Sequence, residues 1–171
     1  MRWMTTAALL LLVLAGCSKP PEKEMWASAV AAQQDRDADK AIERYEALLE
    51  AYPKGERAPE ALFAVGSLYQ NEKHDPGKAL EYYKRLVAAY PDHATASNAA
   101  FMTAFILNND LRQYPAAKEA YQAFLRRYPT DPMAPSAAFE LANIGKSADE
   151  LVPPAQTAER PAARGTAKKG K

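Results

Sequence analysis

Few residues in this 171-residue chain could carry chemistry: it contains one cysteine, Cys17, and two histidines, His74 and His93. One cysteine cannot form an internal disulfide, and two histidines leave few ligands for a metal site. Both histidines fall in expected loops, where a solvated side chain is favoured over a catalytic or metal-binding one. A phosphate-binding glycine loop, an HExxH zinc motif and a GxSxG nucleophile motif do not occur in the sequence. We therefore expect neither an enzyme nor a bound metal or cofactor.

Cys17 stands at the end of a distinctive amino-terminal segment. Arg2 is its only charge, and residues 5–15 form an apolar run rich in leucine. Such a run, at roughly 10–12 residues, is too short to span a bilayer and is typical of a secretory signal peptide. The closing tetrapeptide Leu14-Ala15-Gly16-Cys17 resembles the lipobox of bacterial lipoproteins. This resemblance implies cleavage before Cys17, diacylglycerol on its thiol and acylation of the new amino terminus.

The alternative for Cys17 is an ordinary signal peptide followed by a buried free cysteine. The next residue is Ser18 rather than Asp. By the same resemblance, Ser18 implies sorting to the outer membrane, with the protein anchored on its periplasmic face.

Internal repeats organise the middle of the chain. Tyr-Pro begins at residues 52, 90 and 128, a spacing of 38 residues, and several alanine, tyrosine and phenylalanine positions share that spacing. Each unit contains two stretches with bulky apolar residues at three- and four-residue intervals, which indicates amphipathic helices. Proline after tyrosine sets the helix end, because it lacks an amide hydrogen. We expect about seven helices, near residues 24–36, 38–52, 57–72, 77–90, 95–109, 115–128 and 133–146, the last acting as a cap.

Small residues recur at two fixed places in the repeat, one marked by Gly66 and the other, thirteen residues later, by Ala79. Their lack of bulk would let two antiparallel helices approach closely. This pattern resembles the tetratricopeptide repeat, with a longer unit than the usual one. The resemblance implies an all-α superhelix of antiparallel helix pairs. The 38-residue unit with Tyr-Pro endings is similar to repeats of the BamD-like family of β-barrel assembly lipoproteins and to the repeat domain of the Tol-Pal coordinator family.

The resemblance to tetratricopeptide repeats also implies a binding groove. In tetratricopeptide repeats, fixed positions of the first helix of each pair line the concave surface. Carried onto this sequence, they are Phe63, Ser67, Gln70, Asn71, Phe101, Phe105, Asn108, Asn109, Phe139 and Asn143. Amide side chains can donate to and accept from peptide groups, and aromatic rings supply an apolar floor. The alternative is that the phenylalanines pack between helices and the amides are merely solvated.

The carboxyl-terminal end differs from the repeats in composition. Residues 153–171 carry five basic residues and one acidic residue, and they contain no aromatic residue, Leu, Ile, Val or Met. Such a segment cannot bury enough apolar surface to fold. It is either a solvated tail or an arm that contacts an anionic polymer. We thus expect a signal peptide at 1–16, a lipidated tether at 17–23, a repeat domain at 24–147 and a disordered basic tail at 148–171.

Two functional hypotheses follow from these features. The first is a lipid-anchored periplasmic scaffold that binds an envelope protein or extended peptide in its groove, as an accessory to outer-membrane β-barrel assembly. The second is a Tol-Pal-type coordinator that links peptidoglycan or wall enzymes to the outer membrane. An envelope hydrolase is the least favoured class. The net charge of +1 gives no reason to expect nucleic acid as a partner.

Overall fold

The computed structural model describes residues 19–146 and residue 150, and this part of the chain is all helical, as the sequence predicts. The helices are α1 Glu22–Gln34, α2 Ala38–Ala51, α3 Ala58–Asn71, α4 Pro76–Ala89, α5 Ala96–Phe105, the π-helical turn η1 Ile106–Asp110, α6 Tyr114–Arg127 and α7 Ala134–Ala142. The expected signal peptide, Cys17 and the basic tail beyond residue 150 lie outside the described residues. For these segments the sequence interpretation stays a prediction.

With η1 counted as the end of α5, all helix bounds agree with the predicted ranges within two residues except the end of α7. Helix α7 ends at Ala142, four residues before the predicted end; Asn143 already leaves the helical conformation, and Gly145 then adopts a left-handed backbone with φ of 76°. Helix α6 begins at Tyr114, one residue before the predicted start. At the other end, α1 begins at Glu22, directly after Pro21, so the folded domain starts inside the expected tether.

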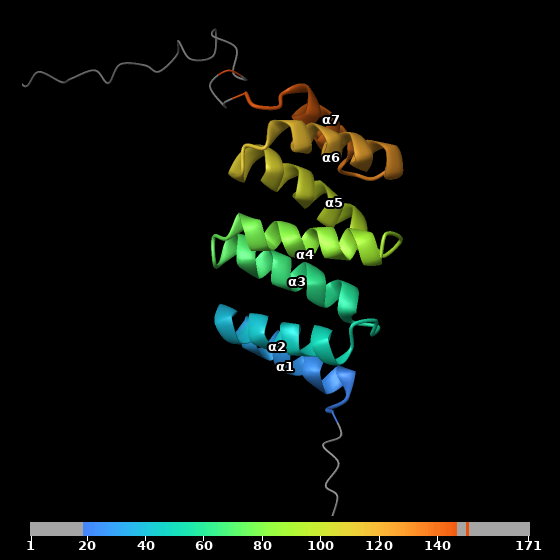
Figure 1. Ribbon diagram of the computed structural model, residues 1–171. Helices are drawn as coiled ribbons and strands as arrows, with labels where there is room; N and C mark the ends of the chain where they lie inside the picture. Colours follow the sequence, from blue (N-terminus) through green and yellow to red (C-terminus); the bar gives the residue numbers. More distant parts are fainter. Residues whose placement is uncertain (1–18, 147–149, 151–171) are drawn as a thin grey trace, which may run out of the picture.

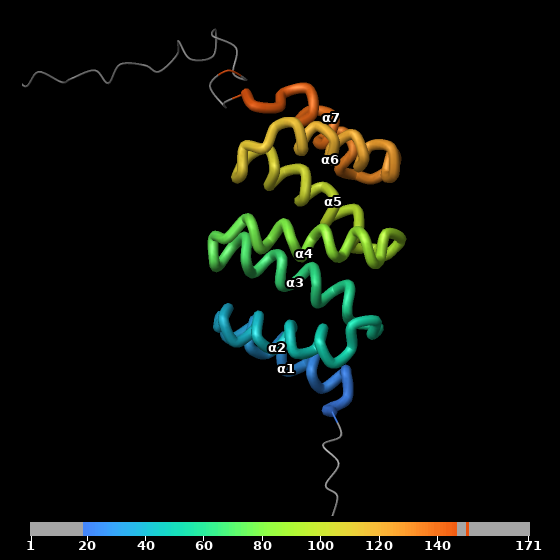
Figure 2. The backbone as a smooth tube through the Cα atoms, in the orientation of Figure 1, coloured from blue at the N-terminus to red at the C-terminus, as the bar shows by residue number. Residues whose placement is uncertain are grey.

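The helices stack one after another into an elongated array (Figure 1). The turns between them are short, so successive helices run antiparallel and each packs against the next in the chain. The backbone trace passes from α1 at one end of the stack to α7 at the other without returning (Figure 2). The first helix of each repeat is called its A helix, and these are α1, α3, α5 continued by η1, and α7. The first three A helices are each followed by a B helix, which is α2, α4 or α6. This arrangement is that of a helical repeat protein.

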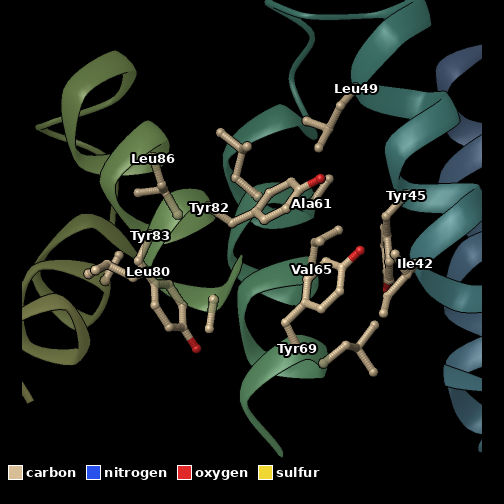
Figure 3. Packing of buried hydrophobic residues seen from close by; sticks show 14 of the residues in the cluster. Ile42, Tyr45, Leu49, Ala61, Val65, Tyr69, Leu80, Tyr82, Tyr83 and Leu86 are labelled. Carbon is tan, nitrogen blue, oxygen red and sulfur yellow. The ribbon is translucent and has the colours of Figure 1, made fainter. Parts of the chain in front are cut away.

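Small residues bring the two helices of a pair together, as the sequence predicts. Ala41, Ala79 and Ala117 of the B helices are all completely buried. A Cβ atom added to Gly66 of α3 would lie 2.8 Å from Cε1 of Tyr83 in α4, too close for an ordinary contact. Figure 3 shows side chains of α2 and α4 packing on both sides of α3, where they form the core.

The turn between the A helix and the B helix has a similar backbone in all three helix pairs. Arg36, His74 and Arg112, spaced by 38 residues, all adopt positive φ of 59°, 50° and 52°. The next residue is the N-cap of the B helix. Asp75 accepts a hydrogen bond from the Lys78 amide through its side chain, whereas the equivalent Gln113 makes no such bond. The same left-handed residue therefore precedes B helices whose N-caps differ.

Candidate partner-binding surface

The predicted residues of α3 lie on one helical face and divide between core and surface. The Phe63 ring centroid is 5.4 Å from that of Tyr83, and Gln70 accepts a hydrogen bond from the Tyr83 hydroxyl at 3.3 Å. These two side chains are therefore half-buried against α4. Asn71 is exposed, and its amide nitrogen donates to Oγ of Ser67 at 3.1 Å. In this repeat, Asn71 is the predicted residue most accessible to a partner.

The two aromatic residues of α5 are used mainly in packing. The Phe101 ring stacks with Phe105 at a centroid distance of 6.4 Å. The rings of Tyr121 and Phe124 in α6 lie nearly perpendicular to the Phe101 ring, at centroid distances of 6.0 Å and 5.9 Å. Phe101 is thus wedged between α5 and α6, which is the packing role weighed against binding in the sequence analysis. Phe105 remains partly exposed beside it.

The neighbouring asparagines Asn108 and Asn109 have opposite surroundings. Asn108 in η1 is buried, with 7% exposure. It donates to the Glu140 carboxylate at 3.4 Å and accepts from the Gly145 amide at 3.3 Å, so it joins η1 to α7 and the loop after it. Asn109 is exposed and donates to the Phe105 carbonyl at 3.2 Å. The amide of Asn108 therefore serves the fold, and Asn109 lies on the surface.

Helix α7 carries the most exposed aromatic residue of the predicted set. Phe139 is 56% exposed, although it is equivalent to the packed Phe63 and Phe101. No B helix follows α7 within the described residues, so nothing in that part of the chain covers the ring. Asn143 donates to the Phe139 carbonyl at 2.8 Å and accepts from Lys146 at 3.1 Å. We call the exposed set Asn71, Asn109 and Phe139 the A-helix surface.

Sequence reasoning missed a buried polar group beside this surface. The hydroxyls of Tyr45 and Tyr83 donate to Gln33 and Gln70, but the equivalent Tyr121 hydroxyl is completely buried and has no hydrogen-bond partner among the described residues. Burial, together with the nearby Glu140 carboxylate, raises the pKa of the Tyr121 phenol. The sequence contained one indication of this missing bond: the position of Gln70, which accepts from Tyr83, is occupied one repeat later by the shorter Asn108.

The two histidines lie in different turns of the repeat domain. His74 is exposed and occupies the left-handed turn position, and His93 contacts Thr95 at 2.9 Å and Glu60 at 3.8 Å. The described residues hold no group of three or more His, Cys, Asp or Glu side chains placed to bind a metal ion. None of the described helices is long and apolar enough to cross a membrane.

The fold and this surface define an α-helical repeat protein of the tetratricopeptide type. Residues 18–148 match the sequence profile of the YfiO family, described as outer membrane lipoprotein, and the chain belongs to that family. The matched residues begin directly after Cys17 and end near the close of the repeat domain. No curated protein matches the chain at a significant level. The family assignment agrees with the BamD-like resemblance of the 38-residue repeats.

Proposed function

We propose that the protein is a non-catalytic scaffold, anchored by lipid on Cys17 to the periplasmic face of the outer membrane. Membership of an outer membrane lipoprotein family supports this location. Each buried CH₂ of an acyl chain contributes about 0.8 kcal/mol to membrane binding, and more than one chain gives a stable anchor. The repeat domain then stands in the aqueous space beside the membrane, where it holds a partner.

The observation that carries the binding role is the exposed ring of Phe139 at the end of the A-helix surface. A large aromatic side chain that is 56% exposed, in a position where its equivalents are packed, is suited to be covered by a partner. The amide nitrogens of Asn71 and Asn109 are held by their own helices, and their amide oxygens make no hydrogen bond among the described residues. Free amide oxygens can accept hydrogen bonds from the peptide N–H groups of an extended segment.

The partner that we propose is an envelope protein or extended peptide of the outer-membrane β-barrel assembly system. The BamD-like character of the family supports this choice. A Tol-Pal-type coordinator is the second candidate, favoured by the net charge of +4 on residues 153–171, which could contact anionic wall polymer. The two candidates differ in what accompanies the protein when it is extracted from membranes.

Affinity purification of the lipidated full chain from detergent-extracted membranes tests this proposal. We expect β-barrel assembly subunits to co-purify with the wild type and to be reduced at least fivefold by Phe139→Ala. The matched control is Tyr114→Ala, because Tyr114 is the other large hydrophobic side chain that is exposed among the described residues. Co-purification of wall enzymes alone would favour the coordinator, and equal recovery with Phe139→Ala would exclude the A-helix surface as the binding site.

The anchor is tested separately with Cys17→Ala. This variant should accumulate as an unlipidated precursor of full length, because the lipobox cysteine is the residue to be acylated. Normal processing with release of a soluble mature protein would show that an ordinary signal peptide precedes residue 17. Deletion of residues 153–171 then tests the tail: unchanged wall and membrane association at low salt would exclude its proposed contact with anionic polymer.

A further inference from the structure

A second candidate surface lies between two B helices, apart from the A-helix surface. Helices α4 and α6 flank a pocket of about 240 Å³, with α5 as its floor. Four alanines (Ala88, Ala100, Ala120 and Ala123) line much of it, and Lys84 and Arg127 stand among its lining residues. None of the predicted partner-binding residues takes part. Phe101 of α5 contacts the ring of the lining residue Phe124 but does not itself line the pocket.

The preceding repeat also has a hollow between its B helices, but different side chains line it. The positions of Ala100, Ala120 and Ala123 are taken there by Leu62, Tyr82 and Arg85. The Tyr82 ring stacks with Tyr69 at 5.7 Å, and its hydroxyl donates to Glu46 of α2, which bridges the two B helices. The hollow between α2 and α4 accordingly lies toward Pro53 and Tyr90 and does not reach Tyr82.

The bridge is lost between α4 and α6. There Ala120 replaces Tyr82, and Lys84 replaces Glu46, so both the ring and the carboxylate are absent. Lys84 is exposed and forms no hydrogen bond or ion pair with any other described residue, whereas Arg127 pairs with Asp92 at 2.7 Å. The pocket is apolar, open to solvent, and has an unpaired cation at its edge. An apolar side chain that covers it would remove apolar surface from water, which favours binding.

We propose that this pocket, which we call the α4–α6 pocket, binds a bulky apolar side chain of a partner protein next to a carboxylate of the same segment. The apolar side chain takes the volume that Tyr82 fills one repeat earlier, and the carboxylate pairs with Lys84. The pocket is below the roughly 300–1,000 Å³ of small-molecule sites, and its size suits one or two side chains. Charge complementarity favours an acidic partner segment over a basic one.

Methyl NMR of the full-length chain labelled at alanine tests the proposal, because four lining residues report directly. The probes are two short capped peptides, one with a central Glu-Phe-Glu and one with Lys-Phe-Lys. We expect the acidic peptide to shift the methyl signals of Ala100, Ala120 and Ala123, and the basic peptide to bind at least fivefold more weakly. Lys84→Glu, an exposed change that should leave the fold intact, should reverse this preference.

A second variant tests occupancy of the volume. Ala120→Tyr restores the residue of the preceding repeat and should abolish the shifts, while the melting temperature shows that the protein is folded. Equal binding of both peptides, or shifts confined to alanines outside the pocket, would overturn the proposal. If dodecyl phosphate shifts these methyl signals and the acidic peptide does not, the pocket accepts lipid chains and the proposal is wrong. These outcomes leave the A-helix surface untouched, since no residue is shared.

Discussion

The hydroxyl of Tyr128 donates a hydrogen bond to the carbonyl oxygen of Pro91, 3.0 Å away, and Tyr90 makes the same bond to Pro53 at 2.9 Å. Each Tyr-Pro pair therefore contacts the pair one repeat earlier. Tyr52 has no earlier Tyr-Pro, and its hydroxyl donates to the Pro20 carbonyl at 2.9 Å. The motif that ends each B helix is thus also a junction between repeats.

Removal of one junction hydroxyl should lower stability modestly. Tyr90→Phe keeps the ring and loses the bond to Pro53, and we expect a loss of about 0.5–1.5 kcal/mol in the free energy of unfolding. Urea denaturation measures this change. Tyr114→Phe is the control, because the Tyr114 hydroxyl has no hydrogen bond among the described residues, and it should leave the midpoint unchanged. Equal midpoints for the two variants would show that the junction bond is energetically silent.

Gly66 lies at the close approach of α3 and α4 and Gly77 does not, so alanine substitution should affect stability differently at the two positions. Gly66→Ala places a methyl group against the Tyr83 ring and should destabilise the protein by about 1–3 kcal/mol. Gly77→Ala meets nothing nearer than the Asp75 carboxylate at 3.4 Å and should be neutral or stabilising by up to about 1 kcal/mol. Thermal unfolding distinguishes them. A melting temperature for Gly66→Ala at or above that of Gly77→Ala would contradict the packing argument.

The unequal N-caps of the B helices predict a stabilising change. Asp75 caps α4, and its replacement by alanine should cost about 1 kcal/mol. Gln113 occupies the same place before α6 without a side-chain cap bond, so Gln113→Asp should add about 0.5–1 kcal/mol. Denaturant unfolding measures both changes in the free energy of unfolding. A destabilised Gln113→Asp variant would mean that the two turns are not equivalent.

Alkaline pH should unfold the domain. Burial raises the pKa of the Tyr83 phenol to about 12 and also raises the pKa of Tyr45, whereas tyrosine in an unfolded chain ionises near pH 10. Above about pH 10 the unfolded chain therefore binds fewer protons, and stability falls as pH rises toward the folded pKa. Circular dichroism and tyrosinate absorbance should show exposed phenols ionising first and buried phenols ionising with unfolding. Ionisation of all nine tyrosines in one step, with helicity intact, would contradict the burial argument.

The sequence predicted the helices well because every 38-residue unit repeats the same apolar spacing and ends at Tyr-Pro. It did not predict the end of α7, because the residue types of Asn143 and Gly145 do not reveal that the backbone leaves the helix at the first and turns left-handed at the second. For the candidate surface, periodicity selected the correct helices but could not separate buried Asn108 from exposed Asn109. That distinction depends on the π-helical turn η1 and on contacts with Glu140 and Gly145.

Site-specific photocrosslinking in intact cells, with a photoreactive residue at position 109 of the lipidated chain, tests whether the A-helix surface binds the proposed partner. Asn109 lies on the A-helix surface, and Glu43, exposed on α2, is the control position. We expect position 109, but not position 43, to form an adduct with a subunit of the outer-membrane β-barrel assembly system. Equal adducts at both positions, or adducts at position 109 with wall enzymes alone, would contradict this expectation.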